Sequence, residues 1–467
     1  MLIGVPNRRV LVNLAVIAIA GLLILGVALP SSRLTLRDLV TQKLTPTPPP
    51  SPPKNEKPPP PQKKYKPTPT YLPPPIKDNF PLLATSTALP PTTTSRPPPP
   101  LLIGFTRSWP ILLQAVVSYI TAGWPPSQIY IVENTGAQQA NARGQLTLQN
   151  PLFLNHTILT TLGVNILQTP TLLSFAQLQN FFLAQTYTHN WPYFFWSHMD
   201  VLALSFEDGL DGDALTPRYD QPGYRSLYEL ALAALRTARE EAAAEGAEER
   251  KRKWALRFFA YDHLTLVNPA AIEDVGGWDT LIPYYMTDCD MHARLAMRGW
   301  GIEDAKAGVI TDVASSLEDL SALYRVEGAS VGFVDPNPPP PKTREDGGRE
   351  AGVKGKGGKS KRDGPLAEDG EEEYDPNLAK WHALRATAHR MFDHKHGDRE
   401  RNTWQLGQHG GEGEPFYYHP AGLAEALDLL TETGREVFRR KWGHRDCALI
   451  SAAGRTFDDA WKVEKDW

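Results

Sequence analysis

A histidine and an aspartate interrupt an apolar stretch near the middle of the chain. The segment YFFWSHMDVLAL (193–204) places His198 and Asp200 between two runs of apolar or aromatic residues. A charge seldom lies inside such a run without a partner or a cation, because burying an unpaired charge is costly. Taken alone, the same residues are also typical of a structural turn. The pattern predicts a buried strand that ends at a polar site, with a partner or a cation beside Asp200.

A second segment, GGWDTLIPYYMTDCDMHARLAMRGWG (276–301), contains Asp288 and Asp290 two positions apart. Its two leading glycines permit a tight bend beside a ligand, and Trp278 offers an aromatic face on which a sugar can stack. Thr287 and Asp290 have the spacing of a capping box, so we expect a helix to begin there. Asp288 and Asp290 lie in its first turn, either for chemistry or only to favour the positive end of the helix.

Alternating strand and helix patterns precede both segments. LLIGF (101–105), QIYIVENTG (128–136) and GVNILQTP (163–170) are short apolar or β-branched runs that end in polar turns. Between and after them, PILLQAVVSYITAG (110–123) and SFAQLQNFFLAQTYTHN (174–190) have helical spacing. Strands that alternate with helices predict a mainly parallel sheet flanked by helices.

Ligands of such sheets gather at the carboxyl ends of the strands. Glu133 and Asp200 both fall where a strand is expected to end. For Glu133, a structural role as a turn acceptor is an equally good interpretation.

Length and composition exclude several classes of protein. The chain has 467 residues, 41% of them hydrophobic, which is enough for a sizeable core. Its formal net charge of -4 is too small to indicate nucleic-acid binding, so no nucleic-acid partner is expected. With only Cys289 and Cys447, a disulfide framework is excluded, while one bridge and two isolated thiols both stay open.

The N-terminal region predicts a membrane anchor. After a short tail (1–9), residues 10–29 are almost wholly apolar and have the length that a bilayer core requires. A cleaved secretory signal is the alternative, although its apolar region is usually shorter. Residues 30–100 are expected to form a disordered stalk, rich in proline from residue 44 on. The charges around the span weakly favour a cytosolic N-terminus, and Asn155 in an N-x-T sequence is compatible with a luminal domain.

Two segments are expected to be insertions. Residues 228–254 are rich in Ala, Glu, Arg and Lys and predict a solvated helix before a further strand, ALRFFAYDHLTLV (255–267). Residues 335–376 are of low complexity and are expected to be disordered. Most of the histidines follow: His382, His389, His394, His396, His409 and His419.

The order of these segments resembles that of the GT-A glycosyltransferases, in particular the family 2-like inverting enzymes of the Golgi type II membrane kind. The resemblance rests on TRSWPILLQAVVSYITAGWPPSQIYIVENTG, SFAQLQNFFLAQ, YFFWSHMDV and VGGWDTLIPYYMTDCDMHARLAMRGW, with FRRKWG (438–443) as a closing segment. It covers roughly residues 101–319, and the order and spacing of the motifs carry it.

The resemblance implies a role for each candidate residue. In the family, the acids of a D-x-D motif hold a divalent cation, Mn²⁺ or Mg²⁺, against the diphosphate of a sugar nucleotide, and Asp200 matches the acid that contacts the metal. His198 stands where the family has the first acid, so it either binds the metal or donates a hydrogen bond. Asp288 matches the acid that takes the proton of the acceptor hydroxyl. The residues expected at the nucleotide sugar are Arg107, Glu133, Asn180, His198 and Trp278.

The expected protein is thus an α/β enzyme with a GT-A domain over residues 101–467, behind a transmembrane helix and a stalk. By resemblance it is a metal-dependent hexosyl- or N-acetylhexosaminyl-transferase that moves a sugar from a nucleotide-sugar donor to a hydroxyl of a glycan or glycoprotein, with inversion. Its expected location is the Golgi or endoplasmic reticulum membrane, single-pass type II, with a luminal catalytic domain.

Two other functions compete with this one. A membrane-tethered binding or scaffold protein on a degenerate fold of the same kind is the alternative. A sugar nucleotidylyltransferase is disfavoured, because LLIGFTRSW (101–109) lacks a glycine-rich phosphate loop.

Overall fold

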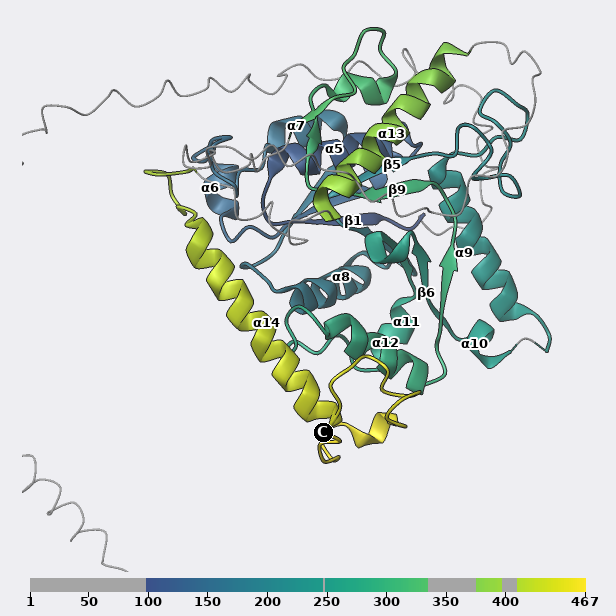
Figure 1. The fold of residues 1–467 in the computed structure, drawn as a ribbon, viewed down its shortest axis with the longest axis vertical. Coiled ribbons are helices and arrows are strands. Elements are labelled where there is room, and N and C mark those ends of the chain that lie inside the picture. The colour runs from purple at the N-terminus through teal and green to yellow at the C-terminus, as the bar shows by residue number, and fades with distance from the viewer. Residues whose placement is uncertain (1–97, 247, 335–374, 397–409) are drawn as a thin grey trace, which may run out of the picture. The chain divides into compact units, whose positions relative to one another are not determined.

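The structure is a computed structural model that describes residues 98–246, 248–334, 375–396 and 410–467 (Figure 1). Within these residues, no helix is both long and apolar enough to cross a bilayer.

Several expected segments fall outside the described residues. They are the cytosolic tail (1–9), the membrane span (10–29), the stalk up to residue 97 and the low-complexity insertion up to residue 374. The structure therefore bears only on the domain expected at 101–467.

A seven-stranded sheet forms the centre of the fold, with the strand order β3-β2-β1-β4-β7-β6-β8. β7 is antiparallel to its neighbours β4 and β6, whereas all other neighbouring strands are parallel. The expected mainly parallel sheet is confirmed. Its strands are β1 (Leu101–Phe105), β2 (Ile129–Glu133), β3 (Asn165–Gln168), β4 (Phe194–Ser197), β6 (Trp254–Phe259), β7 (Leu264–Val267) and β8 (Gly301–Ala305).

Two small sheets of two strands each complete the β structure. One pairs β5 with β9, and the other pairs β10 with β11. These strands are β5 (Val201–Leu204), β9 (Val309–Asp312), β10 (Ser316–Leu317) and β11 (Phe333–Val334).

Helices cover both faces of the central sheet (Figure 1). One face packs against α5 (Trp109–Thr121), α7 (His156–Leu162), α9 (Leu227–Ala243) and α13 (Pro376–His396). The other packs against α8 (Phe175–His189), α11 (Pro269–Asp274) and α12 (Thr287–Met297). The remaining helices are α6 (Gln138–Ala142), α10 (Glu249–Arg252), α14 (Pro420–Trp442) and the short 3-10 helices at Pro126–Gln128, Tyr261–His263, Leu320–Tyr324 and Phe457–Asp459.

The first half of the sheet follows the predicted alternation of strands and helices. α5 is succeeded by Gly123, whose φ of +92° suits a residue without Cβ. α8 begins with a complete capping box between Ser174 and Gln177, which satisfies two backbone N–H groups at its start. Local sequence therefore fixes where both helices begin or end.

The prediction of a single strand at 255–267 is wrong, because the segment forms two strands. β6 and β7 pair in an antiparallel hairpin, and the 3-10 helix Tyr261–His263 connects them. Ala260 and Tyr261 at the bend have φ of +60° and +56°. Since β7 runs against the other strands, its first residues lie at the same edge of the sheet as the carboxyl ends of the others.

The charged helix expected within 228–254 is present but is not solvated all round. In α9, Leu230, Leu235 and Ala238 are buried against the sheet, while charged residues occupy the other side. Ser226 and Glu229 close its N-terminus with a capping box. The charged residues at i, i+4 spacing, which predicted a solvated helix, therefore lie only on the outer side of α9.

The C-terminal segment is tied to α12 by a disulfide. Cys289 in α12 is bonded to Cys447, 158 residues further along the chain, so the bridge is formed rather than the two free thiols. Around it, Ile282, Phe438 and Trp442 form a buried apolar cluster. α14 runs along one side of the domain and ends at this cluster (Figure 1).

Candidate functional site

Polar and strained residues gather where the strands of the sheet end. Ser108, which follows β1 and Arg107, has a φ of +73°, as does Met286, which precedes α12. Together with Ala260 and Tyr261 they are non-glycine residues in the left-handed region, which costs free energy and is found most often at functional sites. Ser108, Ala260 and Tyr261 lie just beyond the carboxyl ends of β1 and β6, so this edge of the sheet is the candidate site.

The register of a small sheet brings two aspartates together. Val201 in β5 pairs with Asp312 in β9, and the backbone N–H of Val313 donates to the carbonyl of Asp200 at 2.8 Å. Asp200 and Asp312 therefore lie on adjacent strands at the same end of this sheet.

A lysine of α13 joins these two carboxylates. The Nζ of Lys395 lies 2.7 Å from Oδ2 of Asp200 and 2.5 Å from Oδ1 of Asp312. Although burial disfavours the charged carboxylate, the ammonium and the imidazole of His198 hold the pKa of Asp200 well below its usual range. The partner or cation that the sequence predicted beside Asp200 is thus the side chain of Lys395 in this structure.

His198 lies between two carboxylates. Its Nδ1 is 3.7 Å from Asp200, its Nε2 is 3.6 Å from Asp262, and its ring stacks on Trp196 at 5.2 Å between centroids. Burial lowers the pKa of His198, but the two carboxylates outweigh it and raise the pKa to about 10. His198 is therefore positively charged at neutral pH, and its Nε2 makes no hydrogen bond to a described residue.

Asp312 has two further imidazoles beside it. His396 Nε2 lies 2.8 Å from Oδ2 of Asp312, and His263 Nε2 lies 3.9 Å from the same oxygen. Burial lowers the pKa of His263, which favours its neutral form. Of the C-terminal histidines, His396 is thus the one that reaches this cluster, and His409 lies outside the described residues.

The described residues do not fit the Mn²⁺ or Mg²⁺ that the resemblance implies. Such an ion needs oxygen ligands converging at about 2.0–2.1 Å, with several left to water or phosphate. No three His, Cys, Asp or Glu side chains of the described chain converge in that way. Lys395 instead holds one oxygen of Asp200 and one of Asp312.

Asp288 lines a small cavity between the central sheet and the helices α8, α11 and α12. The polar lining of this cavity includes Asp262, Asp288 and His292, and its apolar lining includes Trp196 and Trp278. Burial lowers the pKa of His292, which favours its neutral form, and this imidazole lies one helical turn from Asp288. Asp262 lines this cavity and also contacts His198. It therefore connects the segment 193–204 with the segment 276–301.

Asp290 has a different environment from Asp288. It is fully buried and accepts hydrogen bonds from Arg294 at 2.8 Å and Trp442 at 2.9 Å, with Lys441 Nζ at 2.7 Å. The expected capping box at Thr287 is wrong, because Met286 is the N-cap residue and no side chain caps the helix. Asp290 thus holds α14 against α12, and Asp288 is the acid left for chemistry.

Asn180 and Trp278 are joined to each other. Asn180 donates to the carbonyl of Trp278 at 2.9 Å and accepts from its backbone N–H at 2.8 Å. A Cβ on Gly277, whose φ is +80°, would lie 3.0 Å from Asn180 Oδ1, so the turn needs a glycine here. Both polar ends of the Asn180 amide are used, and its role in the structure is to hold the turn that leads to α12.

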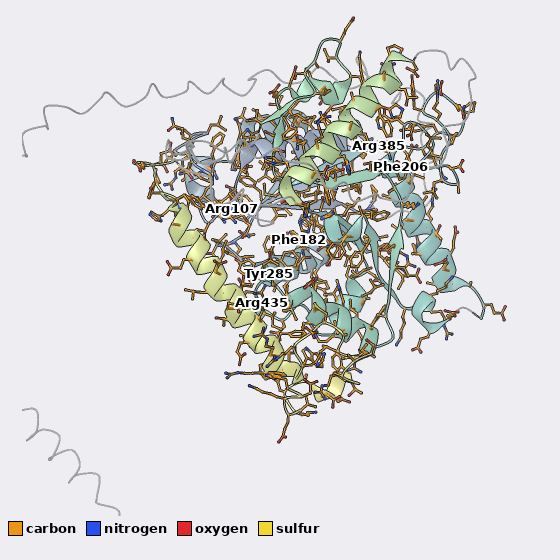
Figure 2. The ribbon with its side chains drawn as sticks, in the orientation of Figure 1. Arg107, Phe182, Phe206, Tyr285, Arg385 and Arg435 are labelled. Atoms are coloured by element: carbon orange, nitrogen blue, oxygen red, sulfur yellow. A yellow bond between two sulfur atoms is a disulfide. The ribbon has the colours of Figure 1, made fainter. Side chains whose placement is uncertain are left out.

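Arg107 is buried at the start of α5. It donates a long hydrogen bond of 3.5 Å to Tyr418, the residue two before α14, and Figure 2 shows it near that end of α14. Burial lowers the pKa of Arg107, although the fields of Tyr418, Tyr284 and Asp200 oppose this shift. Further along α14, Arg435 lies over the ring of Tyr285 at 5.3 Å (Figure 2).

Glu133 lies at the end of β2, but it does not face the other candidate residues. It is fully buried, and its carboxylate accepts from Asn141 at 2.8 Å and Gln168 at 2.9 Å, with His156 Nε2 at 3.0 Å. This geometry supports the structural interpretation of Glu133, since its oxygens are already bonded to three side chains.

We therefore expect Glu133→Ala to lower the free energy of unfolding by at least about 2 kcal/mol, because it leaves buried donors without their acceptor. Urea unfolding together with donor titration measures both effects. If Glu133→Ala weakens donor affinity and leaves stability unchanged, the structural role of Glu133 is contradicted and the predicted contact with the nucleoside is supported.

Four residues of the site were not predicted from the sequence: Asp262, His263, Asp312 and Lys395. A usable signal existed for the first two, since YDH interrupts an apolar run just as SHMD does. For Lys395 the signal is helical spacing. Trp381, Leu384, Ala388 and Met391 form a buried apolar stripe of α13 next to the buried Thr387, and Lys395 stands at the next position of this stripe.

Comparisons with known proteins add little to this geometry. The chain matches no protein-family profile and no curated protein. Several solved structures overlap with part of it, among them three that each have a TM-score of 0.26. The mannosyltransferase PcManGT from Pyrobaculum calidifontis, in complex with GDP-Man and Mn²⁺, is 14% identical, and the overlap covers 50% of this chain and 61% of that one. This chain therefore spans less than two thirds of that mannosyltransferase.

The other two are a cytidylyltransferase from Leptospira borgpetersenii and S. aureus TarS. The cytidylyltransferase is 9% identical over 44% of this chain and 75% of its own. TarS is 8% identical over 44% of this chain and 34% of its own. At such TM-scores and identities, these similarities carry no argument about the present chain.

Proposed function

We propose that the chain is a glycosyltransferase of the GT-A kind that moves a sugar from a nucleotide sugar to a hydroxyl group of a glycan or glycoprotein, with inversion. One observation carries the proposal: Asp288 shares a cavity with Asp262, which in turn contacts the positively charged His198. A proton acceptor and a cationic group thus lie on either side of a single carboxylate.

The reaction needs both of these groups. The oxygen of the acceptor hydroxyl forms a bond to the anomeric carbon as the bond from that carbon to the diphosphate breaks, and the nucleoside diphosphate leaves with the electron pair. Asp288 takes the proton of the hydroxyl, which is typically worth about 10²–10⁴-fold in rate. Positive charge near the leaving phosphate stabilises the charge that develops there. His198 and Arg107 supply it in this proposal, and no step is routed through a metal ion.

A screen of nucleotide sugars tests this function. We expect at least one donor to bind the purified full-length protein in calorimetry and to be hydrolysed slowly or transferred to an added acceptor. Binding without turnover of any donor would favour the alternative of a binding or scaffold protein. No binding of any nucleotide sugar would reject both this function and the GT-A assignment.

The proposed location is the lumen of the Golgi or endoplasmic reticulum, with the domain held by the N-terminal membrane span. The Cys289–Cys447 disulfide supports an oxidising compartment, since such bridges are rare in the cytosol. Asn155 caps α7 through its Oδ1, which leaves its Nδ2 for a glycan.

We expect protease treatment of sealed microsomes to leave the domain intact and detergent to expose it. An endoglycosidase-sensitive glycan on Asn155, absent in Asn155→Gln, serves as an independent marker. Digestion of the domain without detergent would overturn the luminal location.

A further inference from the structure

The contacts of Lys395 make it a fixed part of the site rather than a surface lysine. Its side chain is 3% exposed, and Nζ has three oxygen neighbours: Asp200 at 2.7 Å, Asp312 at 2.5 Å and the carbonyl of Val313 at 3.4 Å. An ammonium group has three N–H donors, so these oxygens use all of its donors. The rest of α13 holds it there, because Leu384, Ala388 and Met391 on the same stripe are buried in the main core.

The carboxylates beside it are engaged on both of their oxygens. Asp312 contacts Lys395 through Oδ1 and His396 through Oδ2. Asp200 contacts Lys395 through Oδ2 and has His198 at 3.7 Å from Oδ1. A divalent ion between Asp200 and Asp312 would need the space that Nζ fills, and it would have to lie against a positive charge.

We propose that Lys395 is the built-in cation of this site, occupying the place between Asp200 and Asp312 at which a divalent metal would otherwise bind. The inference rests on the proposed function, and it adds that donor binding and transfer do not require Mn²⁺ or Mg²⁺. Lys395 offsets negative charge of Asp200 and Asp312, which would otherwise repel the diphosphate, and Arg107 remains as a cation of the chain itself.

Mn²⁺ alone is the probe, added to the full-length protein and followed by the electron paramagnetic resonance signal of the free ion. The wild type is expected to show no saturable binding. Lys395→Ala leaves two facing carboxylates with His396 beside them, and it is expected to bind one Mn²⁺ ion and to gain thermal stability when Mn²⁺ is added. Asp200→Asn in the Lys395→Ala background is expected to abolish this binding.

Lys380→Ala is the matched control on the same helix, because Lys380 donates to the carbonyl of Arg325 at 3.0 Å and not to Asp200 or Asp312. It is expected to behave as the wild type. Saturable Mn²⁺ binding by the wild type that Asp200→Asn removes would overturn the proposal. So would a folded Lys395→Ala protein that binds no Mn²⁺, since the two carboxylates would then not form a cation site.

If Lys395→Ala does not fold, the wild type and Lys395→Arg still test whether donor binding requires a divalent metal. Both retain a cation, so their affinity for the nucleotide sugar found in the donor screen is expected to be the same in EDTA and in Mn²⁺. A donor affinity that falls tenfold or more in EDTA, by about 1.4 kcal/mol, contradicts the proposal while the glycosyltransferase function stands. The Mn²⁺ titration uses no nucleotide. If no nucleotide sugar binds in the donor screen, the glycosyltransferase function is rejected, but the titration still tests whether Lys395 occupies a cation site.

Discussion

Asp288→Asn is expected to leave donor binding unchanged and to lower turnover by roughly two to four orders of magnitude. The amide keeps the shape of the carboxylate but cannot accept the proton of an acceptor hydroxyl. The side chain is half-buried in the cavity shared with Asp262 and His292, and it makes none of the ion pairs that hold Asp290. Its replacement therefore removes a chemical group without removing a structural contact.

Donor titration, transfer rates and thermal melts on the same preparations check this result. Asp290→Asn is the matched control two residues away. It leaves Arg294 and Lys441 facing a neutral amide in a buried position, which is expected to cost about 3–5 kcal/mol of stability. A thermal melt lowered as much by Asp288→Asn as by Asp290→Asn would assign Asp288 a structural role, and unchanged turnover would reject it as the base.

Removal of the disulfide is expected to have the largest effect on stability. Cys289→Ser/Cys447→Ser opens a bridge that spans 158 residues, and the chain-entropy model predicts a loss of about 5 kcal/mol for a loop of this length. The bridge joins α12 to the C-terminal segment, so its loss also loosens the helix that carries Asp288.

Urea unfolding with and without dithiothreitol measures this contribution. The wild type is expected to lose stability when reduced, whereas the double variant is expected to be insensitive to the reductant. If both proteins unfold at the same urea concentration without reductant, the bridge does not contribute as described. Melting of α14 ahead of the sheet would show that the loss is local to the C-terminal segment.

Local sequence was sufficient for the elements whose pattern is self-contained. β1, α5, β2, β3 and α8 could be predicted because each has one hydrophobic period and ends at a glycine, a capping residue or a polar turn. The mainly parallel sheet follows from their alternation. The hairpin of β6 and β7 could not be predicted in this way, because two short apolar strands around a four-residue turn have the same pattern as one long strand.

The sequence by itself determined that Asp200 and Asp288 follow strand or turn signals and that Asp200 needs a partner or a cation. Only the tertiary structure decided that the partner is Lys395, 195 residues away on α13, and that Asp290 pairs with Lys441 while Asp288 lines a cavity. It also decided that Glu133 is enclosed by Asn141, His156 and Gln168. The physical reason is that spacing along the chain fixes which side of a strand or helix a residue occupies, whereas its charge partner depends on which distant element packs against that side.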